Sequence, residues 1–119
     1  MTNVPDDGAD VQPEGDAETV VYDLRVTVDR IEGRSVCGMR PGDCFDLVAS
    51  NELRLPDGKH FCIYALASVL PFLAAKQRQL PAGDWLEQDA EFACPDPEER
   101  LTMRVERIGV RRLRTEDLT

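Results

Sequence analysis

Apolar and polar side chains alternate strictly from residue 22 to residue 29, the period of a strand with one buried face. The same period returns more briefly at about 44–49, 53–55 and 91–94, and a longer alternation starts at Leu101. That last alternation slips by one residue before Ile108, which predicts a β-bulge or the end of the strand there. The pattern therefore predicts a small sheet built from distant stretches of the chain.

The stretch 61–79 has a different period. Its apolar residues recur at spacings of three and four, as Ile63, Leu66, Ala67, Leu70, Leu73 and Ala74 do. This spacing predicts a helix, which Pro71 should kink or break between 69 and 71 because proline lacks an N–H and clashes with the preceding turn. The fold class that follows is α+β: a small, mostly antiparallel sheet packed against a kinked or broken apolar helical segment.

Charge divides the 119-residue chain into unequal parts. The net charge is −9, and six of the 23 acidic residues fall within residues 1–18, which contain no lysine or arginine. A segment with so few apolar side chains cannot bury enough surface to offset the conformational entropy lost on folding. We therefore expect residues 1–18 to form a disordered acidic leader. We expect residues 19–110 to form a single α+β domain that is nearly neutral, followed by a charged C-terminal tail over 111–119.

The acidic balance argues against nucleic acid and anionic membranes as partners, since both attract basic surfaces. No apolar run reaches the roughly 18 to 20 residues that a membrane-spanning helix needs, and the N-terminus has no secretory signal pattern. We therefore expect a small soluble domain in the cytoplasm.

The four cysteines are Cys37, Cys44, Cys62 and Cys94, and their spacing matches no zinc-ribbon, thioredoxin or ferredoxin template. A cytoplasmic setting disfavours structural disulfides. Cys44 lies on a predicted strand, on the face opposite the apolar residues, and we interpret it as structural or incidental. Cys62 stands at the expected N-terminus of the helix, where free N–H groups favour a thiolate and would lower its pKa. It is the candidate catalytic thiol.

Cys37 and Cys94 lie in loop segments that end strands, where functional residues often collect. Asp96 and Glu99 follow Cys94 at a spacing typical of a cap, so we assign them local turn and capping roles rather than acid–base chemistry.

A resemblance to a known family rests on four short motifs: Cys37-Gly38, Pro41-Gly42-Asp43, Cys62 with Ala65, and Cys94-Pro95-Asp96-Pro97. Together they resemble the signature Cys…Pro/Val-Gly-Asp…Cys-x-x-Ala…Cys-Pro-Asp-Pro of a family of small, uncharacterised bacterial and archaeal proteins. The resemblance covers roughly residues 20–108.

It implies that the recurrent cysteines of that family fall on Cys37, Cys62 and Cys94, and that Cys44 has no counterpart. Relatives often carry a histidine before the Gly-Asp turn, where this chain has Gly38-Met39-Arg40. The family supplies no reaction.

Three hypotheses about function stay open. The leading one is a metal or cluster site for zinc, copper(I) or an iron–sulfur cluster, held by Cys37, Cys62 and Cys94, with His60 as the available fourth ligand. The second is a non-enzymatic interaction module with structural cysteines, in which helix 61–79 contacts a second copy or a protein partner. The third is a redox or nucleophilic enzyme in which Cys62 attacks and Cys37 or Cys94 resolves.

Overall fold

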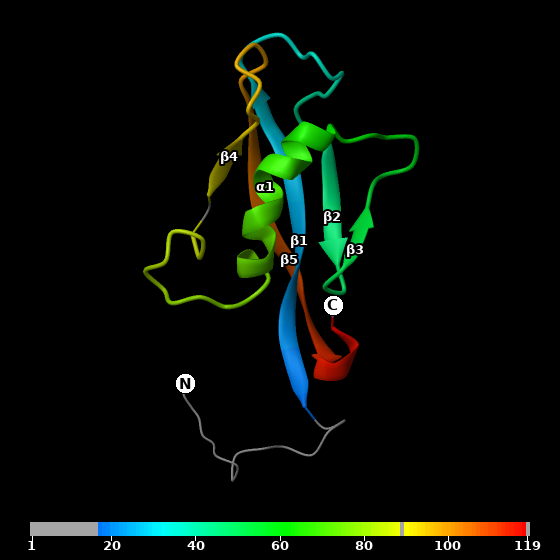
Figure 1. The fold of residues 1–119 in the computed structure, drawn as a ribbon, viewed down its shortest axis with the longest axis vertical. Helices are drawn as coiled ribbons and strands as arrows, with labels where there is room; N and C mark the ends of the chain where they lie inside the picture. Colours follow the sequence, from blue (N-terminus) through cyan, green and yellow to red (C-terminus); the bar gives the residue numbers. More distant parts are fainter. Residues whose placement is uncertain (1–16, 89, 119) are drawn as a thin grey trace.

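The computed structural model describes residues 17–88 and 90–118. Five strands form one sheet in the order β3-β2-β1-β5-β4, and every neighbouring pair is antiparallel (Figure 1). The elements are β1 (Glu18–Ile31), β2 (Cys44–Val48), β3 (Glu52–Arg54), α1 (Ile63–Lys76), β4 (Glu91–Ala93), β5 (Leu101–Arg114) and a 3₁₀ turn, η2 (Thr115–Asp117). The predicted α+β class with an antiparallel sheet is confirmed.

The central strands β1 and β5 pair along their whole length. Asp23 pairs with Gly109 and Leu24 with Arg107, which leaves Ile108 as an extra residue and confirms the predicted bulge. The predicted boundaries at both ends are wrong in detail. Glu18, the last residue of the predicted leader, is the first residue of β1. Ala17 is described as well, and residues 1–16 lie outside the described residues.

The charged tail predicted over 111–119 also begins too early. Residues 111–114 continue β5, because they pair with the start of β1 as far as Arg114 opposite Glu18. The side chain of Arg111 is held by β1 as well, because it donates to the carboxylate of Asp23 at 2.9 Å. A charged sequence is compatible with a strand when its partner strand supplies the opposite charges.

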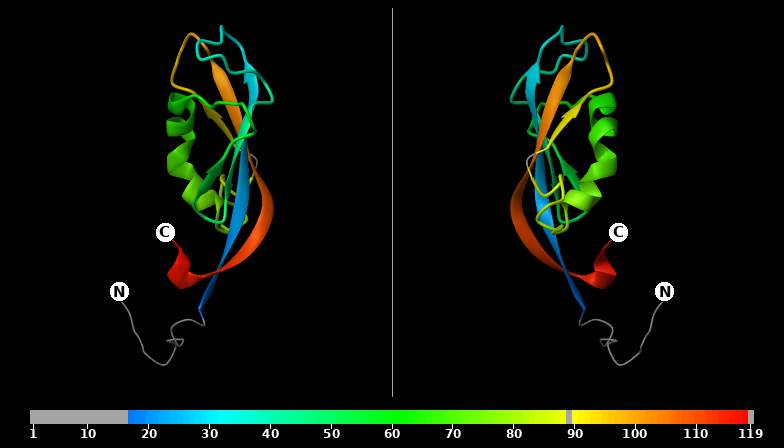
Figure 2. Two further views of the ribbon diagram at one scale, coloured as in Figure 1. Left: turned by 90° about the vertical axis from the view of Figure 1, so that its right-hand side faces the viewer. Right: turned by 90° about the vertical axis from the view of Figure 1, so that its left-hand side faces the viewer.

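Helix α1 covers one face of the sheet (Figure 2). Its inward residues pack on apolar side chains from the strands, and the shared core includes Leu24, Val26, Val28, Phe45, Ala65, Val69, Leu73, Leu101, Met103 and Val105. The opposite face of the sheet carries ion pairs, such as Arg25 with Asp46. The predicted buried face is thus confirmed over residues 24–28.

Helix α1 runs without interruption through Pro71, so of the two predicted alternatives, a kink or a break, the structure excludes the break into two helices. Val69 and Leu73, on either side of the proline, are both buried against the sheet, and this packing holds the two halves in one element. The outer side of α1 remains apolar and exposed at Ile63, Tyr64 and Leu70. None of the helices among the described residues has the length and apolar character needed to cross a membrane.

One end of the sheet gathers segments that are distant in sequence. The end of β1, the start of β2, the start of α1 and the β4–β5 connection all lie at the top of Figure 1. The backbone N–H of Gly33 donates to the carbonyl of Glu99 at 2.9 Å, and that of Arg34 to Glu98 at 3.2 Å. These bonds fasten the loop after β1 to the turn before β5.

Candidate functional site

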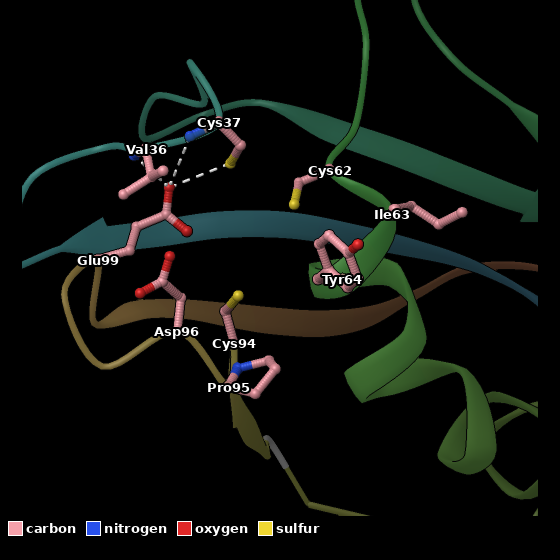
Figure 3. A pocket seen from close by; sticks show the side chains of 9 residues that line it. All are labelled: Val36, Cys37, Cys62, Ile63, Tyr64, Cys94, Pro95, Asp96 and Glu99. Atoms are coloured by element: carbon pink, nitrogen blue, oxygen red, sulfur yellow. Dashed lines mark hydrogen bonds between the residues drawn. The ribbon is translucent and has the colours of Figure 1, made fainter.

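Cys37, Cys62 and Cys94 line one pocket at this end of the sheet. The pocket has a volume of about 550 Å³, and its other walls are formed by Val36, Ile63, Tyr64, Pro95, Asp96 and Glu99. Figure 3 shows the three sulfurs pointing toward the same space from the 32–43 loop, the start of α1 and the end of β4. The fold therefore joins three thiols that are well separated in the chain.

Cys62 is the N-cap residue of α1 and has an extended backbone, with φ of −61° and ψ of 127°. Its carbonyl accepts the first helical hydrogen bond, from Leu66 N–H at 2.9 Å, while its side chain makes no capping bond. No acidic residue occupies the first turn of the helix. The Cys62 thiol thus stands at the start of α1, beside backbone N–H groups that have no partner within the helix.

Cys37 is held by a buried carboxylate. Glu99 is only 1% exposed, and its Oε2 atom accepts a hydrogen bond from the Cys37 thiol at 3.0 Å and another from Val36 N–H at 3.0 Å (Figure 3). Longer contacts of 3.4 Å come from Cys37 N–H and the Ser35 hydroxyl. A buried carboxylate needs such donors, so the 35–37 segment wraps around Glu99.

The second oxygen of Glu99 is different. Among the described residues no hydrogen bond reaches Oε1, and Figure 3 shows this atom turned toward the space between Cys37, Cys94 and Asp96. A buried carboxylate oxygen that faces a cavity is a strong acceptor for a donor supplied by a ligand or water.

Two of the three thiols are held in the neutral form. Burial, the hydrogen bond to Glu99 and the neighbouring Cys62 thiol raise the pKa of Cys37 from 9.0 to about 12. Burial also raises the pKa of Cys94, and the charges of Glu99, Cys62 and Asp96 add to the effect against a backbone hydrogen bond that lowers it. At neutral pH both side chains are therefore thiols rather than thiolates.

The remaining candidate residues lie outside the pocket. The Nε2 atom of His60 is 2.9 Å from the carbonyl oxygen of Cys37, so the exposed imidazole contacts the backbone of the loop. Cys44 lines a separate, shallower pocket with Arg25 and Arg54 on the other side of the sheet. Of the four cysteines, Cys44 is the one set apart, as its position on the strand predicts.

The described residues contain no preformed set of ligands for the predicted metal site. Within residues 17–88 and 90–118, no group of three or more histidine, cysteine, aspartate and glutamate side chains is arranged to hold a metal ion. The roles assigned to Cys37, Cys62, Cys94 and His60 as ligands stay predictions.

Asp96 has the local turn role that the sequence predicts, whereas the sequence did not predict the role of Glu99 in the pocket. Asp96 Oδ1 accepts a hydrogen bond from Glu98 N–H at 2.9 Å, the local turn role expected of it. Glu99, expected to act as a cap, instead reaches the 35–37 segment more than 60 residues away. Its closeness to Cys94 in the sequence was the one available signal.

Comparisons of the chain with protein-family models, curated proteins and solved structures found no match. The resemblance to the cysteine-containing family stays a prediction, and a function has to be inferred from the geometry of the pocket.

Proposed function

We propose that the pocket is a dithiol–disulfide centre in which Cys62 attacks a disulfide substrate and Cys37 resolves the intermediate. The observation that carries this proposal is the position of the Cys37 thiol, which donates a hydrogen bond to a buried carboxylate at 3.0 Å and lines the same pocket as the Cys62 thiol. Among the described residues, the Cys94 thiol has no hydrogen bond to a carboxylate that could take its proton, whereas the Cys37 thiol has one. Cys37 is therefore the better resolving partner.

The reaction begins at Cys62. Its thiolate attacks one sulfur of the substrate R–S–S–R′; a Cys62–S–S–R bond forms and R′–S⁻ leaves. The Cys37 thiol then gives its proton to Glu99, attacks the Cys62 sulfur and releases R–S⁻. The substrate disulfide gains two electrons and becomes two thiols, while Cys37 and Cys62 lose two electrons and become a disulfide.

Glu99 gives this order a physical basis. A thiol with a high pKa is a poor nucleophile while protonated and a strong one once its proton is removed. The bond from the Cys37 thiol to Glu99 Oε2 holds that proton until Cys62 carries the mixed disulfide. In the cytoplasmic setting that we also propose, both thiols would stay reduced until a disulfide arrives.

A second candidate is a thiophilic metal such as zinc or copper(I). It is favoured by the three thiols and the unpartnered Glu99 oxygen on the walls of one pocket, an arrangement rich in soft donors. Binding would require these side chains to close around the ion and lose their protons, so it would depend on Cys94 as much as on Cys37 and Cys62.

An interface on α1 would be compatible with either chemistry. Ile63, Tyr64 and Leu70 are 68%, 70% and 55% exposed, which is unusual for large apolar side chains. Contact with a second copy or a protein partner would cover them, and a mass that changes with concentration in solution would reveal a second copy.

Trapping of the mixed disulfide tests the dithiol proposal. Reduced Cys37→Ser protein, treated with bis(2-hydroxyethyl) disulfide, should retain one 2-hydroxyethylthio group in disulfide linkage on Cys62, because the resolving thiol of Cys37 is absent. In the Cys62→Ser protein, Cys37 should form no mixed disulfide with the reagent. The Cys44→Ser protein should behave like the wild type.

A mixed disulfide that accumulates equally in wild type and Cys37→Ser would contradict the resolving role. A zinc titration separates the second candidate: Cys94→Ser should abolish metal binding if the metal proposal holds, whereas the reaction between Cys37 and Cys62 should survive that substitution.

A further inference from the structure

The walls of the thiol pocket carry charge of one sign. Asp96 and Glu99 line it, and no lysine, arginine or histidine is among the described residues that do so. An unbalanced pair of carboxylates in a partly enclosed pocket makes a negative potential that repels anions and attracts cations. A substrate with carboxylates near its sulfur atoms, such as glutathione disulfide, is disfavoured by these walls.

Glu99 supplies a specific acceptor within this field. Glu99 is only 1% exposed, and its Oε2 atom already accepts hydrogen bonds from Cys37 and Val36. Oε1 has no hydrogen-bond partner among the described residues and faces the pocket (Figure 3). A donor on the ligand would complete the hydrogen bonding of this buried group, and an ammonium would also balance its charge.

The remaining walls are largely apolar. Val36, Ile63, Tyr64 and Pro95 surround the three cysteines, and the volume of about 550 Å³ lies within the range of about 300–1,000 Å³ typical of small-molecule sites. Short hydrocarbon arms would pack against these side chains while the sulfurs meet Cys62.

Resting on the proposed thiol chemistry, we infer that the substrate is a small disulfide whose hydrocarbon arms carry an amine. The ammonium binds Glu99 Oε1 and the carboxylate of Asp96, and this contact brings the substrate sulfur to Cys62. In the exchange, the bond between Cys62 and the substrate sulfur forms, the substrate S–S bond breaks, and the departing aminothiolate takes a proton from solvent.

Rates of mixed-disulfide formation at Cys62 test this selectivity. The full chain carrying Cys37→Ser is reacted separately with cystamine, neutral bis(2-hydroxyethyl) disulfide and glutathione disulfide, and peptides are quantified by mass spectrometry. The rate of each reagent with a small free thiol in solution corrects for its intrinsic reactivity, because Cys44 lies beside Arg25 and Arg54 and is not a neutral reference.

After this correction, cystamine should react at Cys62 about tenfold faster than glutathione disulfide at low salt, and added salt should reduce the ratio. Asp96→Asn keeps an oxygen that can accept from Glu98 N–H and should lower the ratio of the cystamine rate to the glutathione disulfide rate. Equal corrected rates, or a preference for glutathione disulfide, would overturn the inference.

The selectivity measured at Cys62 does not depend on the resolving step, because the Cys37→Ser protein has no resolving thiol. Selective modification of Cys62 without a later disulfide in the wild type would contradict the proposed function alone. Unselective modification followed by a normal disulfide would contradict the amine specificity alone.

Discussion

Replacement of Glu99 by glutamine should make Cys37 more reactive. The amide keeps the shape of the side chain and an oxygen that can accept the bonds from Val36 N–H and the Cys37 thiol, but it removes the buried negative charge. Since that charge opposes ionisation of the neighbouring thiol, Glu99→Gln should lower the pKa of Cys37.

The size of the effect follows from the causes of the shift. The pKa of Cys37 rises from 9.0 to about 12, burial is the largest cause and the hydrogen bond to Glu99 is the second. Removing the second-largest cause should therefore raise the thiolate fraction of Cys37 at pH 9 several-fold in Glu99→Gln, while burial keeps the pKa of Cys37 above 9.0. The loss of charge assistance in two bonds should also lower the free energy of unfolding by about 1–3 kcal/mol.

Alkylation by iodoacetamide between about pH 7 and 11, resolved by peptide mass spectrometry, measures the thiolate fraction at Cys37 directly. Glu98→Gln is the matched control, since Glu98 is exposed and paired with Arg34, and it should leave the profile of Cys37 unchanged. An unchanged or slower alkylation of Cys37 in folded Glu99→Gln would refute the role given to the carboxylate.

Three further predictions concern stability. Because the pKa of folded Cys37 is raised to about 12, its contribution is complete below about pH 9 and is lost as the pH rises toward 12, so Cys37→Ser should flatten the alkaline decline of urea midpoints. The pKa of Glu87 is lowered to about 2, chiefly by Arg107; this contribution is present above about pH 4.5 and is lost toward pH 2, so Glu87→Gln should flatten the acid decline. A Cβ atom at Gly33 would lie 1.8 Å from the carbonyl oxygen of Glu98, and Gly33→Ala should lower the free energy of unfolding in urea by about 1–3 kcal/mol. Each result would be contradicted by a variant whose curve overlays that of the wild type.

The parts of the fold that depend on local periodicity could be predicted from the sequence. Alternation placed the buried face of β1 over Leu24 to Val28, and one slip in the alternation located the bulge at Ile108. The course of the helix through Pro71 could not be predicted in this way, because burial of residues on both sides of the proline against the sheet decides it.

The extent of β5 was missed for a similar reason. Residues 111–114 have a polar, arginine-rich sequence, and only their pairing with the start of β1 makes them a strand. Strand ends that depend on a distant partner have no local signal.

The candidate site combines both situations. The surroundings of Cys62 at a helix N-terminus could be predicted from the sequence, as could the isolation of Cys44. The meeting of Cys37 with Glu99 could not, since it joins residues separated by 62 positions through the closure of the sheet. The capping spacing of Glu99 was a misleading local pattern, because the segment that follows Asp96 forms a turn rather than a helix.

The most direct test of the proposed dithiol centre is disulfide mapping of the wild-type protein after reaction with a small disulfide. The reduced chain is treated with bis(2-hydroxyethyl) disulfide, digested without reductant and examined for linked peptides. The account predicts one dominant linkage, between Cys37 and Cys62, with Cys94 still a free thiol. A dominant linkage that includes Cys94 or Cys44, or a stable mixed disulfide on Cys62 beside a free Cys37, would contradict it.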